Sequence, residues 1–174
     1  KVTDLLIELA EAALNNGDVD GKLQNVVNRF KAITEDLELG EEILQVIADD
    51  LRERINGDRS NSELFTDSLK AAGEDNNAKV IAAYFSKAGI PAKYVSPKEG
   101  LVVNDLPERT YALPEAYDNL SKLKNEDKVI VFPGFFGYTK NGTLRTFDRG
   151  GSDITGSILA AAVNADLYEN FTDV

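Results

Sequence analysis

The chain has 174 residues, of which 43% are hydrophobic, and its formal net charge at pH 7 is −11. This length suits one domain with a sizeable core, and the lack of any basic patch disfavours nucleic acid as a partner. Cysteine and histidine are both absent, which excludes disulfides, thiol nucleophiles, Ser-His-Asp triads and zinc sites built on Cys or His.

The acidity is concentrated in the first part of the chain. Residues 1–77 carry 8 basic and 18 acidic side chains, whereas residues 78–174 carry 11 and 12. This charge pattern is typical of a solvated face. No apolar run approaches the length of a membrane span and no signal-like segment opens the chain, so we expect no membrane association.

Hydrophobic periodicity predicts four successive helices before residue 73, with no strand among them. Residues 1–72 are therefore expected to form a mostly helical block without chemistry of its own. The first helix contains Leu5, Leu6 and Leu9 and ends at Asn15–Asp18, and the others are predicted over 19–37, 41–55 and 62–72.

Strands and helices alternate after Gly73, which predicts an α/β part over residues 73–174. Such alternation implies a mainly parallel sheet with helices on both faces, a three-layer α/β/α sandwich that binds ligands at the carboxyl ends of its strands. The expected helices are 74–88, 114–123 and 152–165, the strands are 92–96, 101–103, 128–132, 143–147 and one beginning at Tyr168, and 107–109 is a loop.

The junction from Arg149 to Asp153 is the strongest candidate for a site. Two glycines let the backbone come close to a ligand, Ser152 or Asp153 can cap the following helix, and Arg149 offers a planar fork suited to a carboxylate or phosphate. Asp153 would repel an anion unless Mg²⁺ lies between them or the carboxylate shares a proton with a nearby donor. An ordinary capped turn with a surface arginine is the alternative interpretation of this junction.

A wider set of motifs resembles aspartokinase, the aspartate kinase of the amino-acid kinase superfamily, in its Gram-positive type. The resemblance covers nearly the whole chain and is strongest from about Gly73 onward. It is carried by Phe-Pro-Gly-Phe-Phe-Gly-Tyr-Thr (132–139), Thr-Leu-Arg-Thr-Phe (143–147), Arg-Gly-Gly-Ser-Asp (149–153), Phe-Thr-Asp-Val (171–174) and Gly-Glu-Asp-Asn-Asn-Ala (73–78).

This resemblance implies the amino-acid kinase fold and transfer of the ATP γ-phosphoryl group to L-aspartate, in a cytoplasmic and homo-oligomeric parent enzyme. Mg²⁺ would enter with ATP and would not be held directly by the chain. Aspartate needs no general base as acceptor, because its carboxylate, with a pKa of about 3.9, is already ionised. The implied roles are catalysis for Asp153, aspartate binding for Glu74, Gly134, Phe135, Arg149, Gly150, Gly151 and Ser152, and nucleotide binding for Thr172 and Asp173.

Taken alone, Glu74 also reads as a first-turn acid favoured by a helix dipole, and one of Phe135 and Phe136 as a core residue. The family's Lys-Phe-Gly-Gly-Ser/Thr motif, its Asp-Gly-Ile continuation and its regulatory ACT domains are absent from the sequence. The usual Leu-Gly before Arg-Gly-Gly-Ser-Asp is here Phe147-Asp148. We therefore expect an incomplete kinase domain that is inactive alone.

Two other functions are compatible with the sequence. Another amino-acid kinase, for glutamate or acetylglutamate, would share the sheet and the glycine-rich turns. A non-enzymatic module would instead use the helical block for assembly.

Overall fold

The computed structural model describes residues 1–106 and 108–171. The chain forms two compact units, one from Lys1 to Ala92 and one that begins at Lys93.

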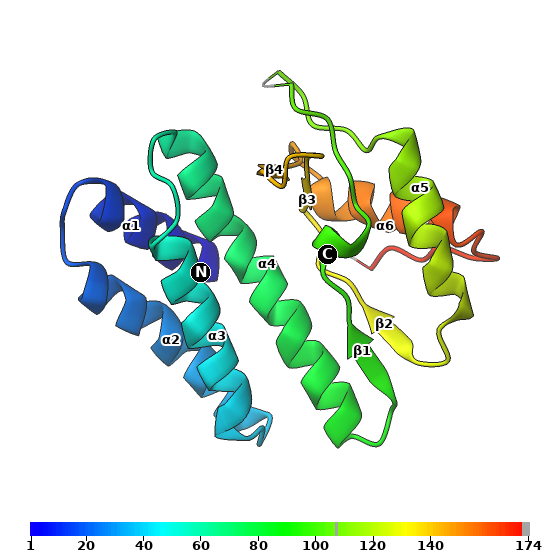
Figure 1. Cartoon of the computed structure of the whole chain (residues 1–174). Coiled ribbons are helices and arrows are strands. Elements are labelled where there is room, and N and C mark those ends of the chain that lie inside the picture. Colours follow the sequence, from blue (N-terminus) through cyan, green and yellow to red (C-terminus); the bar gives the residue numbers. More distant parts are fainter. Residues whose placement is uncertain (107, 172–174) are drawn as a thin grey trace. The chain divides into compact units, whose positions relative to one another are not determined.

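The first unit consists of four helices (Figure 1). They are α1 (Val2–Leu14), α2 (Val19–Asp36), α3 (Glu41–Ile55) and α4 (Ser62–Lys87). The three helices predicted before residue 56 are confirmed, because their ends carry local stop and start signals. The Asp18 side chain, for example, accepts a hydrogen bond from the Gly21 N–H at 2.9 Å and so caps α2.

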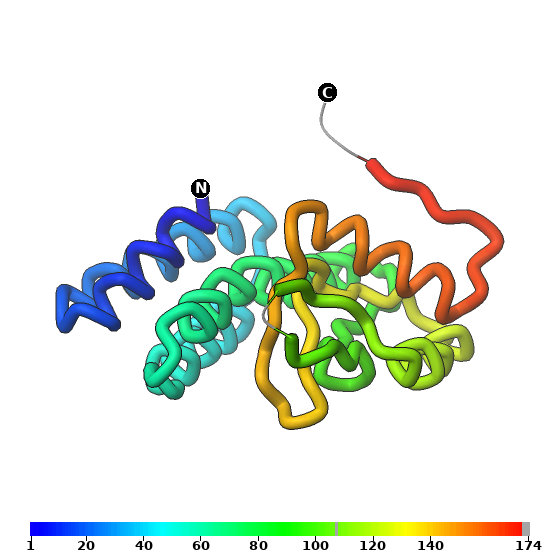
Figure 2. The backbone as a smooth tube through the Cα atoms, turned by 90° about the horizontal axis from the view of Figure 1, so that it is seen from above, coloured from blue at the N-terminus to red at the C-terminus, as the bar shows by residue number. Residues whose placement is uncertain are grey.

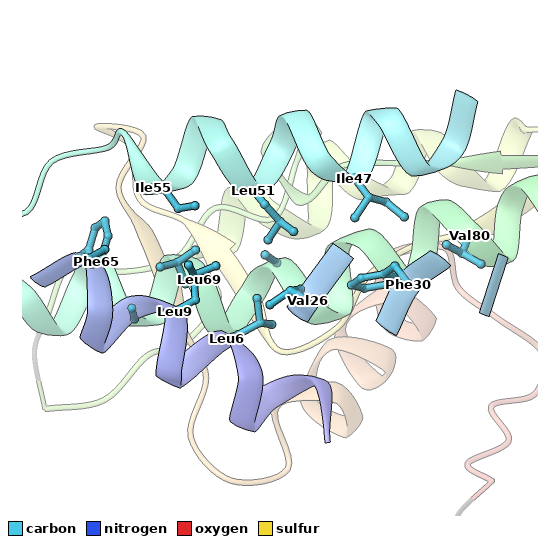
Figure 3. Close-up of a cluster of buried hydrophobic side chains, with 13 residues drawn as sticks. Leu6, Leu9, Val26, Phe30, Ile47, Leu51, Ile55, Phe65, Leu69 and Val80 are labelled. Atoms are coloured by element: carbon cyan, nitrogen blue, oxygen red, sulfur yellow. The ribbon is translucent and has the colours of Figure 1, made fainter. Parts of the chain in front are cut away.

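Apolar side chains from all four helices meet in one core (Figure 3). The predicted periodic positions Leu6 and Leu9 of α1 are fully buried, and α1 packs against both α2 and α4. Burial of large aliphatic and aromatic side chains supplies the main stabilisation of such a bundle. The core includes Leu6, Leu9, Val26, Phe30, Ile47, Leu51, Ile55, Phe65, Leu69 and Val80.

The prediction of a helix end at Ala72 and a new helix at Glu74 was wrong, because α4 runs unbroken through Gly73. A glycine inside a helix is less favourable than alanine by about 1 kcal/mol, but packing decides here. A Cβ on Gly73 would lie 3.1 Å from Cδ1 of Leu6, so the glycine lets α1 approach α4 closely. Glu74 therefore lies in the middle of a helix, and its interpretation as a first-turn acid is also wrong.

Charged side chains of α3 and α4 form a buried network beside this core. Arg54 binds Asp50 at 3.0 Å and Asp75 at 2.9 Å, and Lys79 binds Asp75 at 3.0 Å. The fully buried Asn76 amide donates to Asp50 at 2.8 Å. Each charged side chain of the network therefore has an oppositely charged partner, which offsets the cost of its burial.

The described part of the second unit contains short strands and the helices α5 and α6. Helix α5 (Pro114–Leu120) packs against α6 (Gly151–Ala162), and α5 continues as the 3₁₀ helix η2 (Ser121–Asn125). Among the described residues the strands form two small sheets, β1 (Ala92–Tyr94) with β2 (Val129–Val131) and β3 (Phe136–Tyr138) with β4 (Leu144–Thr146). The mixed α/β character is confirmed, whereas the large parallel sheet stays a prediction.

The sequence predicts a turn over residues 134–137, but this turn includes only Gly134 and Phe135, because residues 136–137 belong to β3 of the hairpin β3–β4. Strand β3 pairs antiparallel with β4, and Gly137 lies inside it. A Cβ on Gly137 would lie 2.8 Å from the Leu101 carbonyl oxygen, so this glycine permits close approach of the 101–103 segment. That segment was predicted as a strand, but among the described residues it makes two isolated bridges, Val102 with Tyr138 and Val103 with Ala112.

The 3₁₀ helix η1 (Pro97–Glu99) follows β1. Two further predictions concern irregular segments and the end of the chain. Residues 108–109 are irregular as predicted, while Pro107 lies outside the described residues. The strand expected from Tyr168 is wrong over 168–171, where the chain turns back along α6 without strand pairing (Figure 2). The phenol of Tyr168 packs there on Gly156, where a Cβ would lie 2.9 Å from the ring carbon that bears the hydroxyl.

The buried network predicts a specific acid sensitivity. Burial alone would raise the pKa of the Asp50 carboxyl, but Arg54, Lys79 and Asn76 together hold that pKa below its ordinary value. Because the folded-state pKa is lowered, this stabilisation is present above about pH 4 and is lost as the pH falls through the lower folded-state value. Asp50→Asn should lower the free energy of unfolding at pH 6 by roughly 1–3 kcal/mol and flatten its decline below about pH 4.

Urea unfolding followed by circular dichroism across this pH range measures the effect. Asp36→Asn, which changes an exposed acid at the end of α2, serves as the control and should retain the wild-type decline. Equal pH profiles for the wild type and Asp50→Asn would contradict the prediction.

Candidate active site

The predicted site residues of the second unit come from two turns that touch. One turn follows β2 and contains Gly134, and the other is the first turn of α6 and contains Gly151. A Cβ on Gly134 would lie 2.9 Å from Cα of Ser152, and a Cβ on Gly151 would lie 3.0 Å from the Phe135 ring. Gly134 therefore permits close approach of the backbone, and Gly151 leaves room for the Phe135 ring.

Phe135 adopts a left-handed backbone conformation with a φ of 82°. This conformation costs a residue other than glycine roughly 1–2 kcal/mol, so surrounding contacts must hold it. The Phe135 N–H donates to Oγ1 of Thr155 at 3.2 Å, and its carbonyl accepts from the Phe147 N–H at 2.7 Å. Phe136 is fully buried, so it is the core member of the aromatic pair, as predicted for one of the two.

The prediction that Ser152 or Asp153 caps α6 was wrong. Its N-cap is Gly150, which has a φ of 82°, and Ser152 and Asp153 lie within the first turn. Within the described residues no side chain caps this end. The backbone N–H groups of a helix's first turn have no partner inside the helix and favour negative charge.

Arg149 and Asp153 are both exposed beside this helix end. Arg149 makes no hydrogen bond or ion pair to another residue in ranges 1–106 and 108–171, so its guanidinium is available to a ligand. Asp153 accepts a hydrogen bond from the Asn170 side-chain amide at 3.1 Å. A neutral donor thus contacts the carboxylate that the sequence predicts to be catalytic.

Glu74 belongs to the first unit. It lies on α4 next to Asp75 of the buried network. Although its side chain keeps contact with solvent, partial burial raises the pKa of the Glu74 carboxyl above its ordinary value. The remaining predicted residues, Thr172 and Asp173, lie outside the described residues.

Two residues of this site were missed by sequence reasoning. Thr155 is 1% exposed and contacts both turns, and Asn170 contacts Asp153. A threonine four residues after Gly151 looks like an ordinary helix residue, so no sequence signal marked it. Asn170 was missed because its segment was predicted to be a strand.

Two cavities of the second unit, of about 430 and 510 Å³, lie elsewhere. The larger is mainly apolar and is lined by Ile130, Phe132 and Leu159, and the smaller by Lys98, Glu115 and Tyr138 among others.

In the part of the chain that the structure describes, no cluster of three acidic side chains could hold a metal ion. None of the described helices is long and apolar enough to cross a membrane.

Comparison with known proteins extends these observations. The chain is 53% identical to Aspartokinase 3 of Bacillus subtilis (strain 168) over 175 residues, which is all of this chain and 38% of that protein. It is 26% identical to an aspartokinase of Bacillus sp. (strain MGA3) over 164 residues, 88% of this chain and 39% of that protein. The chain thus spans less than two fifths of the length of these curated relatives.

Solved structures are similar over the same span. The aspartate kinase of Clostridium acetobutylicum matches with a TM-score of 0.81 and 30% identity, over all of this chain and 37% of that one. Aspartokinase III of E. coli, solved with aspartate and ADP, matches with a TM-score of 0.68 over 95% of this chain and 38% of that one. At 22% identity the second match supports the fold alone.

The resemblance to aspartokinases is confirmed by these matches. The model of the amino acid kinase family matches residues 2–174, nearly the whole chain. The chain therefore belongs to the amino acid kinase family.

Proposed function

We propose that the full-length protein containing this chain is an ATP-dependent aspartate kinase. It would transfer the γ-phosphoryl group of ATP to the side-chain carboxylate of L-aspartate and form 4-phospho-L-aspartate, the first step of lysine, threonine and methionine biosynthesis. The observation that carries the proposal is 53% identity to Aspartokinase 3 of Bacillus subtilis along the whole chain, which includes both turns of the site.

The aspartate contacts are those that the resemblance to aspartokinases implies. The exposed guanidinium of Arg149 would bind a substrate carboxylate through paired, charge-assisted hydrogen bonds. The left-handed backbone and ring of Phe135 would line the pocket with Gly134 and Gly150. Ser152 and Gly151, at the uncapped end of α6, would complete it. For Glu74, the resemblance implies a contact with the ammonium group of aspartate.

MgATP is the second substrate in this proposal. Phosphoryl transfer depends on positioning and on neutralising charge, and the first-turn N–H groups of α6 are suited to a developing negative charge. Asp153 would orient the transferred group and its Mg²⁺, and Thr172 and Asp173 would begin the nucleotide-binding segment. The attacking aspartate carboxylate is already ionised and needs no base.

Completion of the fold is part of the same proposal. We infer that the small sheets of the second unit belong to a larger, mainly parallel sheet in a three-layer α/β/α domain. The Lys-Phe-Gly-Gly-Ser/Thr motif is not among these residues, so catalysis would need further chain. We expect the whole enzyme to be cytoplasmic and homo-oligomeric, as the resemblance implies.

Substrate selectivity tests this function directly. The full-length protein should release ADP from MgATP in the presence of L-aspartate but not of L-glutamate or N-acetylglutamate. A coupled assay for ADP, together with hydroxylamine trapping of the acyl phosphate, measures this selectivity. Turnover only with glutamate or N-acetylglutamate would indicate another amino-acid kinase, and no ATP turnover at all would favour an assembly module.

Arg149 and Asp153 should affect different kinetic constants. Arg149→Ala should raise the aspartate KM by about 30- to 900-fold, since a lost charged pair is worth roughly 2–4 kcal/mol. Asp153→Asn should instead lower kcat, because its proposed role is exercised on the transferred group. Steady-state kinetics with both substrates varied separates the two effects.

Two variants control for loss of charge alone. Asp148→Asn changes an exposed acid on the same loop, and Arg109→Ala changes an exposed arginine of the same unit. Both should retain kinetics within about threefold of the wild type. Wild-type kinetics for both Arg149→Ala and Asp153→Asn would refute the assigned roles.

The proposed role of Glu74 predicts a pH dependence. Since its pKa is raised, the carboxylate becomes neutral at a higher pH than an ordinary glutamate on acidification, and the aspartate KM should begin to rise correspondingly early. Glu74→Gln should raise the aspartate KM at neutral pH and remove this pH dependence, with the ATP KM unchanged. Glu63→Gln, at the start of the same helix, should match the wild type, and an unchanged KM profile in Glu74→Gln would argue against the contact.

A further inference from the structure

We propose that Thr155 is a positioning residue that fixes the Phe135 turn against the first turn of α6. Its hydroxyl accepts the Phe135 N–H at 3.2 Å and donates to the Gly151 carbonyl at 2.9 Å. The side chain is only 1% exposed, so water does not compete for these bonds. One hydroxyl thereby joins the two turns that carry the candidate site.

The bond to Gly151 alone would be unremarkable, because threonine often bonds the carbonyl four residues earlier in a helix. Ser157 does the same to the Asp153 carbonyl at 2.9 Å. Thr155 differs because it also accepts the N–H of a residue 20 positions away. That residue, Phe135, has a left-handed backbone whose conformation needs external support.

The two turns pack closely around Thr155. Gly134 and Gly151 each allow contacts that a Cβ would bring to about 3 Å, with Ser152 and Phe135 respectively. A shift of the Phe135 backbone would therefore displace the start of α6. Since Asp153 and the first-turn N–H groups belong to that start, Thr155 would act on the site without touching substrate.

This assignment rests on the proposed aspartate kinase function only for the identity of the substrate. In the full-length enzyme, Thr155→Val keeps the shape of the side chain and removes both hydrogen bonds. It should raise the aspartate KM at least about tenfold while the ATP KM stays within about twofold. Thr155→Ser, which restores the hydroxyl, should return the aspartate KM to within about threefold of the wild type.

Amide hydrogen exchange at Phe135, measured by NMR, provides a readout independent of activity. The wild-type amide should exchange slowly, and Thr155→Val should speed its exchange selectively, whereas the control Ser157→Ala should change neither exchange nor KM. A fast wild-type Phe135 amide would overturn the proposal even if Thr155→Val failed to fold.

The remaining outcomes are also decisive. A Thr155→Val enzyme with wild-type aspartate KM and a protected Phe135 amide would overturn the proposal. A fall in kcat together with similar rises in the aspartate KM and the ATP KM and a lowered Tm would also overturn it, since this result indicates a merely structural role. If the wild type does not phosphorylate aspartate, the proposed function fails while the exchange measurement still decides the role of Thr155.

Discussion

The close contact between two backbone turns is the constraint on which the candidate site depends. Gly134 lies against Ser152 and Gly151 lies against Phe135, at separations that a Cβ would crowd. The half-buried turn after β2 thereby meets the uncapped start of α6. Phe135, at this contact, has an unfavourable left-handed backbone conformation. Local backbone strain of this kind is often found at functional sites.

In the first unit, contacts with α1 and α3 hold α4 in one register. Gly73 allows α1 to approach, and the network of Asp50, Arg54 and Asp75 pairs α4 with α3. Apolar burial supplies most of the stability, whereas a buried polar network favours one arrangement of the helices over others. Glu74 extends from α4 beside this network, so its position follows from the register that these contacts set.

Sequence reasoning succeeded where signals were local and failed where packing overrode them. The ends of α1, α2 and α3 were predicted because capping residues and helix breakers mark them. Gly73 was taken as a helix end, since its close contact with Leu6 comes from a distant segment. Gly137 was likewise assigned to a turn, although it lies in β3 because the 101–103 segment packs on it.

The arrangement of the candidate site could be predicted only in part, and the roles of its residues stay predictions. The glycines and Phe135 were identified by their motif, and the structure brings them together with Ser152. Thr155 and Asn170 could not be identified, since their contacts cross 20 and 17 positions along the chain and no pattern marks them. The roles proposed for Arg149, Asp153 and Glu74 rest on their charge and on the resemblance, and the fold does not assign these roles by itself.

The most direct measurement is a crystal structure of the full-length protein with L-aspartate and ADP. An aspartate carboxylate should then lie about 3 Å from the Arg149 guanidinium, with the ligand against the Phe135 turn. Aspartate bound away from the contact between the two turns, with Arg149 facing solvent, would contradict this prediction.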